Sequence, residues 1–170
     1  MNSLDEKNVA IFSGGRGTKN IFGALQGVPL SIDFLINGYD SGLSTGRARW
    51  AFEGLLGPSD FRKTLTTVLS RGSPSDREIS SLFENRDFLE RYINGGTTSR
   101  PKILKEFIPN VQYDKGRWIE SSLNIFADTK PVQDRTLNLK DFSVGNAIFC
   151  SIFVQNQTIL IWLYVRFVMN

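Results

Sequence analysis

The first forty residues alternate between apolar runs and glycine-rich turns. Val9–Phe12 is wholly apolar and ends at a Ser-Gly-Gly turn, which is typical of a strand buried on both faces. Thr18–Leu25 can form a helix, and Val28–Asn37 holds a second apolar segment that ends at Gly38. This order of strand, turn, helix and strand predicts a right-handed βαβ unit, and therefore an α/β fold with a parallel sheet flanked by helices.

The middle of the chain is predicted to be mainly helical. Pro58 starts a helix, with Ser59 as its candidate N-cap, that Gly72-Ser73-Pro74 ends. A capping box at Ser75–Glu78 opens the next helix, which we expect to reach about Tyr92. Three further helices are predicted, over Pro101–Phe107, Arg117–Phe126 and Ser143–Val154.

The C-terminal segment Thr158–Met169 reads TILIWLYVRFVM. It is about 12 residues long, whereas a membrane-spanning helix needs about 20 apolar residues. We interpret it as a core strand or an exposed apolar tail and expect no membrane partner, with membrane insertion as the minor alternative. An exposed apolar tail would favour self-association, so a homo-oligomer is also expected.

Composition narrows the class of protein. A chain of 170 residues with 41% hydrophobic content suits one globular domain. Its 20 basic and 17 acidic residues leave a net charge of +3 without a long basic run, which argues against nucleic acid as a partner. The polar start MNSLDEKN lacks the pattern of a secretory signal, so we expect a cytoplasmic protein.

The chain contains no histidine and one cysteine, Cys150. A serine or cysteine nucleophile activated by histidine is therefore excluded, as is a zinc site built from histidine and cysteine. Any metal would be a hard cation bound by oxygen atoms. Cys150 stands in the apolar run Ala147–Val154, so we expect a buried thiol.

A glycine loop follows the first predicted strand, at the position where α/β sheets bind phosphate. Its sequence SGGRGT fits neither the dinucleotide fingerprint, because Asn20 replaces the third glycine, nor the Walker pattern. The alternative is a plain tight turn, and Arg16 can face either phosphate or solvent. The candidate phosphate-binding residues here are Ser13, Gly14, Gly15, Gly17 and Thr18.

A second loop, Tyr39–Arg47, follows the second predicted strand. Asp40 at the strand end can accept a hydrogen bond from a ribose hydroxyl or hold a magnesium ion. The alternative role for Asp40 is to cap a turn. Ser44, Thr45 and Arg47 add anion-binding groups. The loop therefore predicts a second phosphate-binding element.

Two predicted helix starts carry further candidates. In Gly57–Lys63, Asp60 suits the positive end of the helix dipole, whereas Arg62 and Lys63 are unfavourable there and favour a bound anion or solvent. Phe142–Ala147 is a start rich in small residues that contains Asn146. Its alternative is an ordinary helix start.

These four segments, in this order, resemble the 2-phospho-L-lactate transferase and gluconeogenesis-factor superfamily. FSGGRGT resembles its opening F-S-G-G-T-G, and NGYDSGLSTGR resembles Y-D-D-G-L-S-T-G of one branch. LLGPSDFRKTL resembles G-P-S-D-I-R-K, and SVGNAIF resembles a later helix start with L-G-N. The resemblance covers about residues 9–150 and implies a Rossmann-like fold.

One branch of this superfamily transfers a 2-phospho-lactyl group from a guanosine diphosphate carrier to a deazaflavin alcohol with magnesium. Another branch binds nucleotide-sugars and regulates gluconeogenesis. The resemblance implies a nucleotide-diphosphate-linked partner, Mg²⁺ at Asp40, and catalytic roles for Asp40 and Arg62. It places the nucleotide among the glycine-loop residues and a second set, which comprises Ser44, Thr45, Arg47, Asp60 and Asn146.

Two departures bear on activity. Ser41 replaces the second acid of the family's paired-aspartate motif. Family members are roughly twice this length, and the resemblance ends near Gln155. We therefore divide the chain into a nucleotide-binding domain, 1–155, and an atypical apolar tail, 156–170. The domain is incomplete relative to the family. Our hypothesis for the tail is a shifted reading frame. Three functions remain open: a transferase, a non-catalytic nucleotide-sugar-binding regulator, and a remnant with partial ligand binding.

Overall fold

The computed structural model describes residues 7–14, 17–28, 30–39, 42–129, 137–139, 142–156 and 166–168. Eight helices and three strands lie within these ranges. In chain order the elements are β1 (Lys7–Ser13), α1 (Gly17–Ala24), β2 (Leu30–Ile36), α2 (Leu43–Ala51), α3 (Pro58–Leu69), α4 (Pro74–Glu84), α5 (Phe88–Asn94), α6 (Gly96–Phe107), α7 (Tyr113–Asp128), α8 (Val144–Asn156) and β3 (Arg166–Val168).

The described sheet has the order β1-β2-β3. Strands β1 and β2 are parallel, from the pair Lys7 and Leu30 to the pair Ser13 and Ile36, which confirms the predicted order of strand, helix and parallel strand and the α/β class. Strand β3 is antiparallel to β2, with Arg166 opposite Asp33. The sheet is therefore mixed, and three residues of the apolar C-terminal segment form a strand. The rest of that segment lies outside the described residues.

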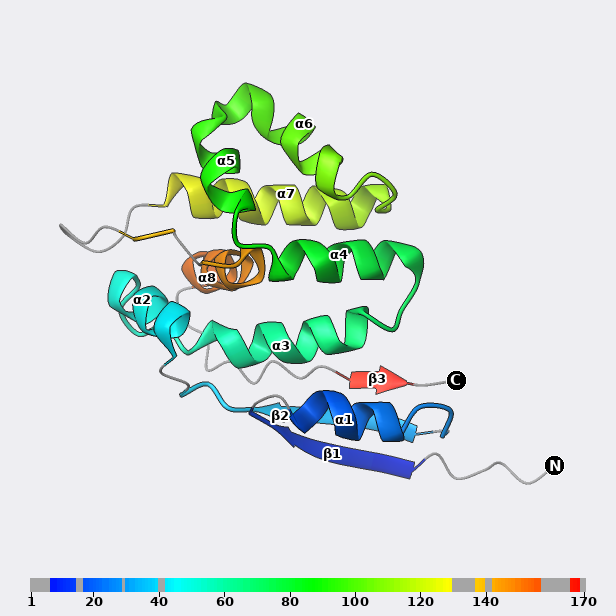
Figure 1. Ribbon diagram of the computed structural model, residues 1–170. Helices are drawn as coiled ribbons and strands as arrows, with labels where there is room; N and C mark the ends of the chain where they lie inside the picture. The colour runs from blue at the N-terminus through cyan, green and yellow to red at the C-terminus, as the bar shows by residue number, and fades with distance from the viewer. Residues whose placement is uncertain are drawn as a thin grey trace.

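The elements stack in layers above the sheet (Figure 1). Helices α1 and α3 lie next to the strands, α4 and α8 lie above α3, and α7 separates them from the α5–α6 pair. A small apolar cluster, which includes Ile32, Phe34 and Phe22, joins the sheet to α1 and α3. A larger cluster fills the space between the helices, and Cys150 lies within it, fully buried as predicted. Burial strongly raises the pKa of the Cys150 thiol, which is therefore a core group rather than a nucleophile.

The predicted second loop is wrong from Leu43 onward, because this segment forms α2. Gly42 is the N-cap residue and gives no side-chain hydrogen bond to the first turn. Ala48 and Ala51 are fully buried against the helical core, and their burial stabilises a helix that contains Gly46. Ser44, Thr45 and Arg47 therefore lie on a helix rather than in a loop.

The helix predicted from Ser75 to Tyr92 is two helices. Ser73, not Ser75, is the N-cap of α4, since Pro74 takes the first helical position. The side chain of Ser73 forms the capping box with Asp76. Asn85 ends α4 and its side-chain oxygen accepts hydrogen bonds from the backbone of Asp87 and Phe88, so α5 begins there. For the same reason Gly57, not Ser59, is the N-cap of α3, because Pro58 takes its first position.

Asp76 links the start of α4 to α7. Hydrogen bonds from Lys115 and Ser73 lower the pKa of the Asp76 carboxyl below its ordinary value of 3.8. We expect Asp76→Ala to lower the free energy of unfolding at neutral pH by about 1 kcal/mol, as loss of a helix cap does. The stabilisation by a carboxyl with a lowered pKa is present above 3.8 and is lost as the pH falls through the lower folded value.

Urea unfolding of both proteins between neutral and acidic pH checks this prediction. The difference in unfolding free energy should shrink once the pH falls below 3.8. Asp114→Ala is the control, because Asp114 is also an acid in a first helical turn, that of α7. A difference that stays constant down to acidic pH would contradict the role of the Asp76 charge.

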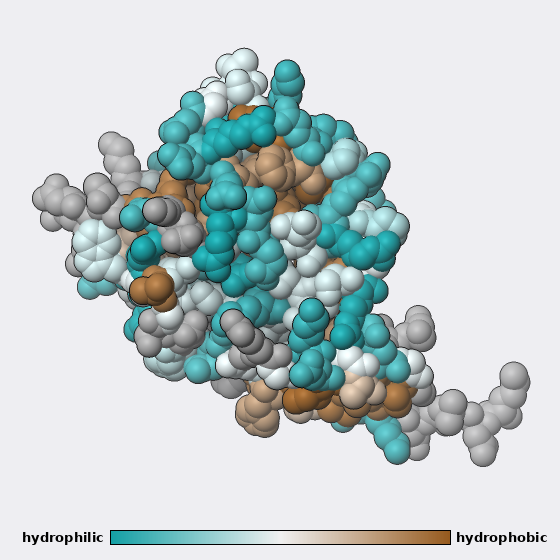
Figure 2. Space-filling model, in the orientation of Figure 1, coloured by the Kyte–Doolittle hydropathy of each residue, from teal (hydrophilic) through white to brown (hydrophobic). Residues whose placement is uncertain are grey.

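Apolar side chains gather on the lower edge of the molecule, where the sheet lies (Figures 1 and 2). Phe12 on β1 and Ile21 on α1 are among the exposed large hydrophobic residues. The helical layers above present mainly hydrophilic side chains on the same face. None of the helices in the described part of the chain combines the length and apolar character needed to cross a membrane.

Candidate functional site

Four helices begin around the first turn of α3. Strands β1 and β2 both end on the left in Figure 1, where α1, α2 and α3 start. Short side-chain contacts join these starts: Ser13 to Thr18 and Thr64, Thr45 to Ser59, and Asn146 of α8 to Ser59. Helix starts carry unpaired N–H groups and the positive end of the helix dipole, so their convergence creates an environment that favours anions.

The glycine turn is fixed by a buried chain of hydroxyl groups. Ser13 Oγ lies 2.9 Å from Thr18 Oγ1 and 2.6 Å from Thr64 Oγ1, so it ties β1 to both α1 and α3. The backbone N–H of Asn37 donates to the carbonyl of Ser13 over 3.1 Å, which extends the pairing of the two strands past their ends. The turn is thus held on three sides.

Gly14 faces the first turn of α3. A Cβ atom added at Gly14 would lie 3.9 Å from Asp60 Oδ2 and 3.8 Å from the Cβ of Asn37, which is ordinary van der Waals contact. Asp60 is only 4% exposed, and its other carboxylate oxygen accepts a hydrogen bond of 2.8 Å from Lys63. A buried carboxylate thus lies against the glycine turn, with Oδ2 outside that ion pair.

The starts of α2 and α8 meet on the other side of α3. Thr45 Oγ1 donates to Ser59 Oγ over 2.6 Å, and Asn146 Nδ2 lies 3.5 Å from the same oxygen. Asn146 is 1% exposed, and its Oδ1 atom has no hydrogen-bond partner within the described structure. Buried amide oxygens are rarely left unpaired, so this atom is a candidate ligand contact.

The structure thus brings six of the predicted residues into two groups: Ser13, Gly14, Thr18 and Asp60 at the glycine turn, and Thr45 and Asn146 around Ser59. Gly17 is exposed at the start of α1, and Ser44 and Arg47 lie half buried on α2. Gly15 and Asp40, with the metal role predicted for Asp40, lie outside the described residues.

Arg62, for which a bound anion or solvent was expected, has a carboxylate partner within the protein. Arg62 is 7% exposed and forms an ion pair with Glu84 of α4. Its side chain passes under Gly145, where an added Cβ would lie 2.7 Å from Arg62 Cγ. Lys63 likewise has a protein partner, Asp60, so neither cation requires a bound anion.

Sequence reasoning missed Thr64. The signal was present, because Thr64 is four residues after Asp60 and therefore on the same face of a helix. The hydroxyl of Ser13 also needs a partner once it is buried, and a hydroxyl on that face of α3 is the group within reach. Only the packing of β1 against α3 identifies this pair.

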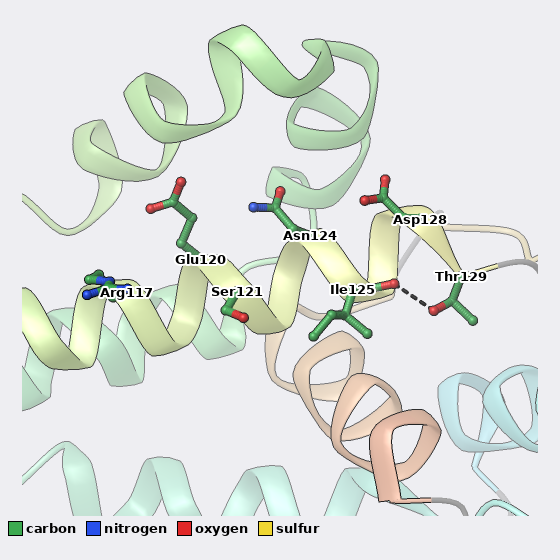
Figure 3. Close-up of a pocket in the computed structure, with 7 residues that line it drawn as sticks. All are labelled: Arg117, Glu120, Ser121, Asn124, Ile125, Asp128 and Thr129. Carbon is green, nitrogen blue, oxygen red and sulfur yellow. Dashed lines mark hydrogen bonds between the residues drawn. The ribbon is translucent and has the colours of Figure 1, made fainter.

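A groove of about 610 Å³ runs along α7, away from these residues (Figure 3). Glu120, Asn124 and Asp128 project from α7 towards α5 and α6. Tyr92 and Arg100 both donate to the side-chain oxygen of Asn124, and burial and nearby Glu120 raise the pKa of Tyr92 to about 12. None of the predicted site residues lines this groove.

Magnesium is the cation that the resemblance implies. Among the described residues no group of three acidic, histidine or cysteine side chains lies close together. Mg²⁺ normally takes only one or two carboxylates and completes its coordination with phosphate and water, so the donors here fit it. Asp60 Oδ2, which faces the glycine turn, is the described carboxylate oxygen suited to hold it.

Comparison with protein-family models finds no match, and neither do the searches of curated proteins and of solved structures.

Proposed function

We propose that this chain binds the diphosphate of a nucleotide-linked compound at the glycine turn and, as a transferase of the 2-phospho-L-lactate type, passes a phosphorus-containing group to a hydroxyl acceptor. The observation that carries the proposal is the convergence of helix starts around Ser59 and Gly14. N-cap residues without a side-chain cap, Gly42 and Gly57, open two of these helices. The starts of these helices carry the positive end of the helix dipole and suit phosphate oxygens.

Different residues of the proposed site have different roles. The hydroxyl chain through Ser13 holds the turn open, and the glycine at position 14 lets a phosphate approach the backbone. Asp60 provides a carboxylate oxygen at the same place. A bound Mg²⁺ would neutralise charge on the diphosphate. The acceptor hydroxyl would attack the phosphorus of the transferred group and release its proton to solvent. The bond from this phosphorus to the bridging oxygen would break and a nucleoside monophosphate would leave, so no histidine is required.

Replacing Gly14 by alanine tests the site. The added methyl group meets only ordinary contacts, so we expect an unchanged melting temperature without ligand. It occupies the space between the turn and Asp60, so we expect guanosine and uridine diphosphates to bind at least about tenfold more weakly, a change of about 1.4 kcal/mol. Calorimetric titration with and without Mg²⁺ measures this.

Gly116→Ala is the matched control, since Gly116 is remote on α7 and an added Cβ meets nothing within 4 Å. Diphosphate binding that survives Gly14→Ala would contradict the placement of the site. If neither diphosphate binds the unaltered protein nor raises its melting temperature, the proposal itself is wrong.

A second candidate function is non-catalytic binding, as in the regulatory branch of the superfamily. The ion pair between Arg62 and Glu84 favours it, because the arginine expected to stabilise the transferred phosphoryl group is engaged elsewhere. Asp60→Asn separates the two functions. It should abolish turnover in a transferase, whereas in a regulator it should change only the affinity and its dependence on Mg²⁺.

A further inference from the structure

A groove of about 400 Å³ lies beside the candidate site, between α1, α3 and α4. It has the volume of a small-molecule site. Among the described residues its lining consists of Lys19, Lys63, Thr66, Thr67, Ser70, Ser80 and Glu84.

Each hydroxyl group of this groove already donates a hydrogen bond within the protein. Each donates to a carbonyl or carboxylate oxygen of α3 or α4: Thr67 to Lys63, Ser70 to Thr67, Ser80 to Thr66, and Thr66 to Glu84. A hydroxyl has one hydrogen and two lone pairs, so these four oxygens remain as acceptors. A ligand that fits them must bring donors.

The charges of the groove favour an anion. Glu84 is paired with Arg62, and Lys63 with Asp60. The ammonium group of Lys19 makes no hydrogen bond or ion pair within the described residues, so it is the surplus charge. A ligand that carries both hydroxyl donors and negative charge is a phosphorylated polyol.

The groove adjoins the proposed phosphate site. Lys63 contacts Asp60, whose second oxygen faces Gly14, and Lys19 follows Thr18, whose hydroxyl bonds to Ser13. A phosphate ester at the glycine turn can therefore extend its organic group past Lys63 and along α3.

We infer that the groove binds the hydroxylated aliphatic part of the substrate, which makes polyol phosphate esters the substrate class of this site. The inference rests on the proposed phosphate site at the glycine turn. It assigns positioning of the ester oxygen to Lys19 and recognition of the substrate hydroxyls to Thr67, Ser70 and Glu84.

Two esters of equal charge and chain length test the inference, sorbitol 6-phosphate and hexyl phosphate. We expect sorbitol 6-phosphate to bind the unaltered protein at least about tenfold more tightly in a calorimetric titration, since its hydroxyls can donate hydrogen bonds to the groove oxygens. The double variant Thr67→Val, Ser70→Ala should lose most of this preference and leave the affinity for hexyl phosphate unchanged. Lys19→Gln should weaken the binding of both esters.

The double variant Thr98→Val, Ser99→Ala is the control, because it makes the same chemical change on the exposed face of α6. It should keep the full preference, and melting curves verify that both double variants are folded. Equal affinity of the unaltered protein for the two esters, or a preference that survives the groove variant, would overturn the inference and leave the phosphate site standing. If neither ester nor pyrophosphate binds, both proposals fall together.

Discussion

Glu84→Ala is expected to lower the free energy of unfolding by about 2–3 kcal/mol, because it leaves the buried guanidinium of Arg62 without a partner. Breaking a fully buried pair costs about 3–5 kcal/mol. The Arg62 side chain is 6% exposed, but that of Glu84 is 46% exposed. We expect a smaller loss of stability because water can partly replace the Glu84 carboxylate. Thr66 loses its 2.8 Å acceptor in the same change.

Equilibrium urea unfolding measures this cost, with Glu106→Ala as the control. Glu106 pairs with Arg91, and both side chains are about half exposed at 43% and 53%. Removal of an exposed pair should change the unfolding free energy by no more than about 0.5 kcal/mol. A similar, small cost for both variants would show that Arg62 does not depend on Glu84.

Gly145→Ala is expected to destabilise the protein by about 1–3 kcal/mol, which is the usual cost of an added methyl group in a tightly packed site. The new Cβ would lie 2.7 Å from Arg62 Cγ and 3.2 Å from Phe83 Cβ, so one of these groups must move. Arg62 Cγ lies in the buried part of its side chain and cannot swing into solvent. Alanine in a helix otherwise stabilises relative to glycine, so the sign of the effect is informative.

Gly116→Ala provides the opposite case within α7. An added Cβ there meets no atom within 4 Å, so we expect a gain of up to about 1 kcal/mol from helix propensity. Thermal unfolding of the two variants should give shifts of opposite sign. An equal gain for both would mean that α8 does not pack against Arg62 as described.

Apolar runs that end at glycine turns identified β1 and β2, and α1 was expected between them. The apolar face of the segment after Pro58 identified α3. The start of α4 was misplaced by two residues, since Ser73 and Ser75 are both acceptable caps and Pro74 decides between them. Helix α2 was missed. Its sequence LSTGRARWA contains turn-forming residues, and the burial of Ala48 and Ala51 that stabilises it arises only from packing against distant helices.

The candidate site was partly predictable for a similar reason. Glycines and hydroxyls at strand ends and helix starts are local signals, and they indicated Ser13, Gly14, Asp60 and Asn146. The partner of Arg62 was not predictable, because Glu84 is 22 positions away on another helix and nothing near Arg62 in the sequence identifies it. The local charge pattern therefore indicated a bound anion beside Arg62, where the fold instead provides the carboxylate of Glu84.

The meeting of Thr45, Ser59 and Asn146 also has a consequence for folding. These side chains come from segments spread over most of the described chain, and Asn146 reaches Ser59 across 87 positions. Contacts of such sequence separation form late, after the loop-closure entropy has been overcome. The site that we propose is therefore complete only once α8 has docked. A ligand at about 100 times its dissociation constant would stabilise the whole chain, rather than one loop, by about 2.7 kcal/mol.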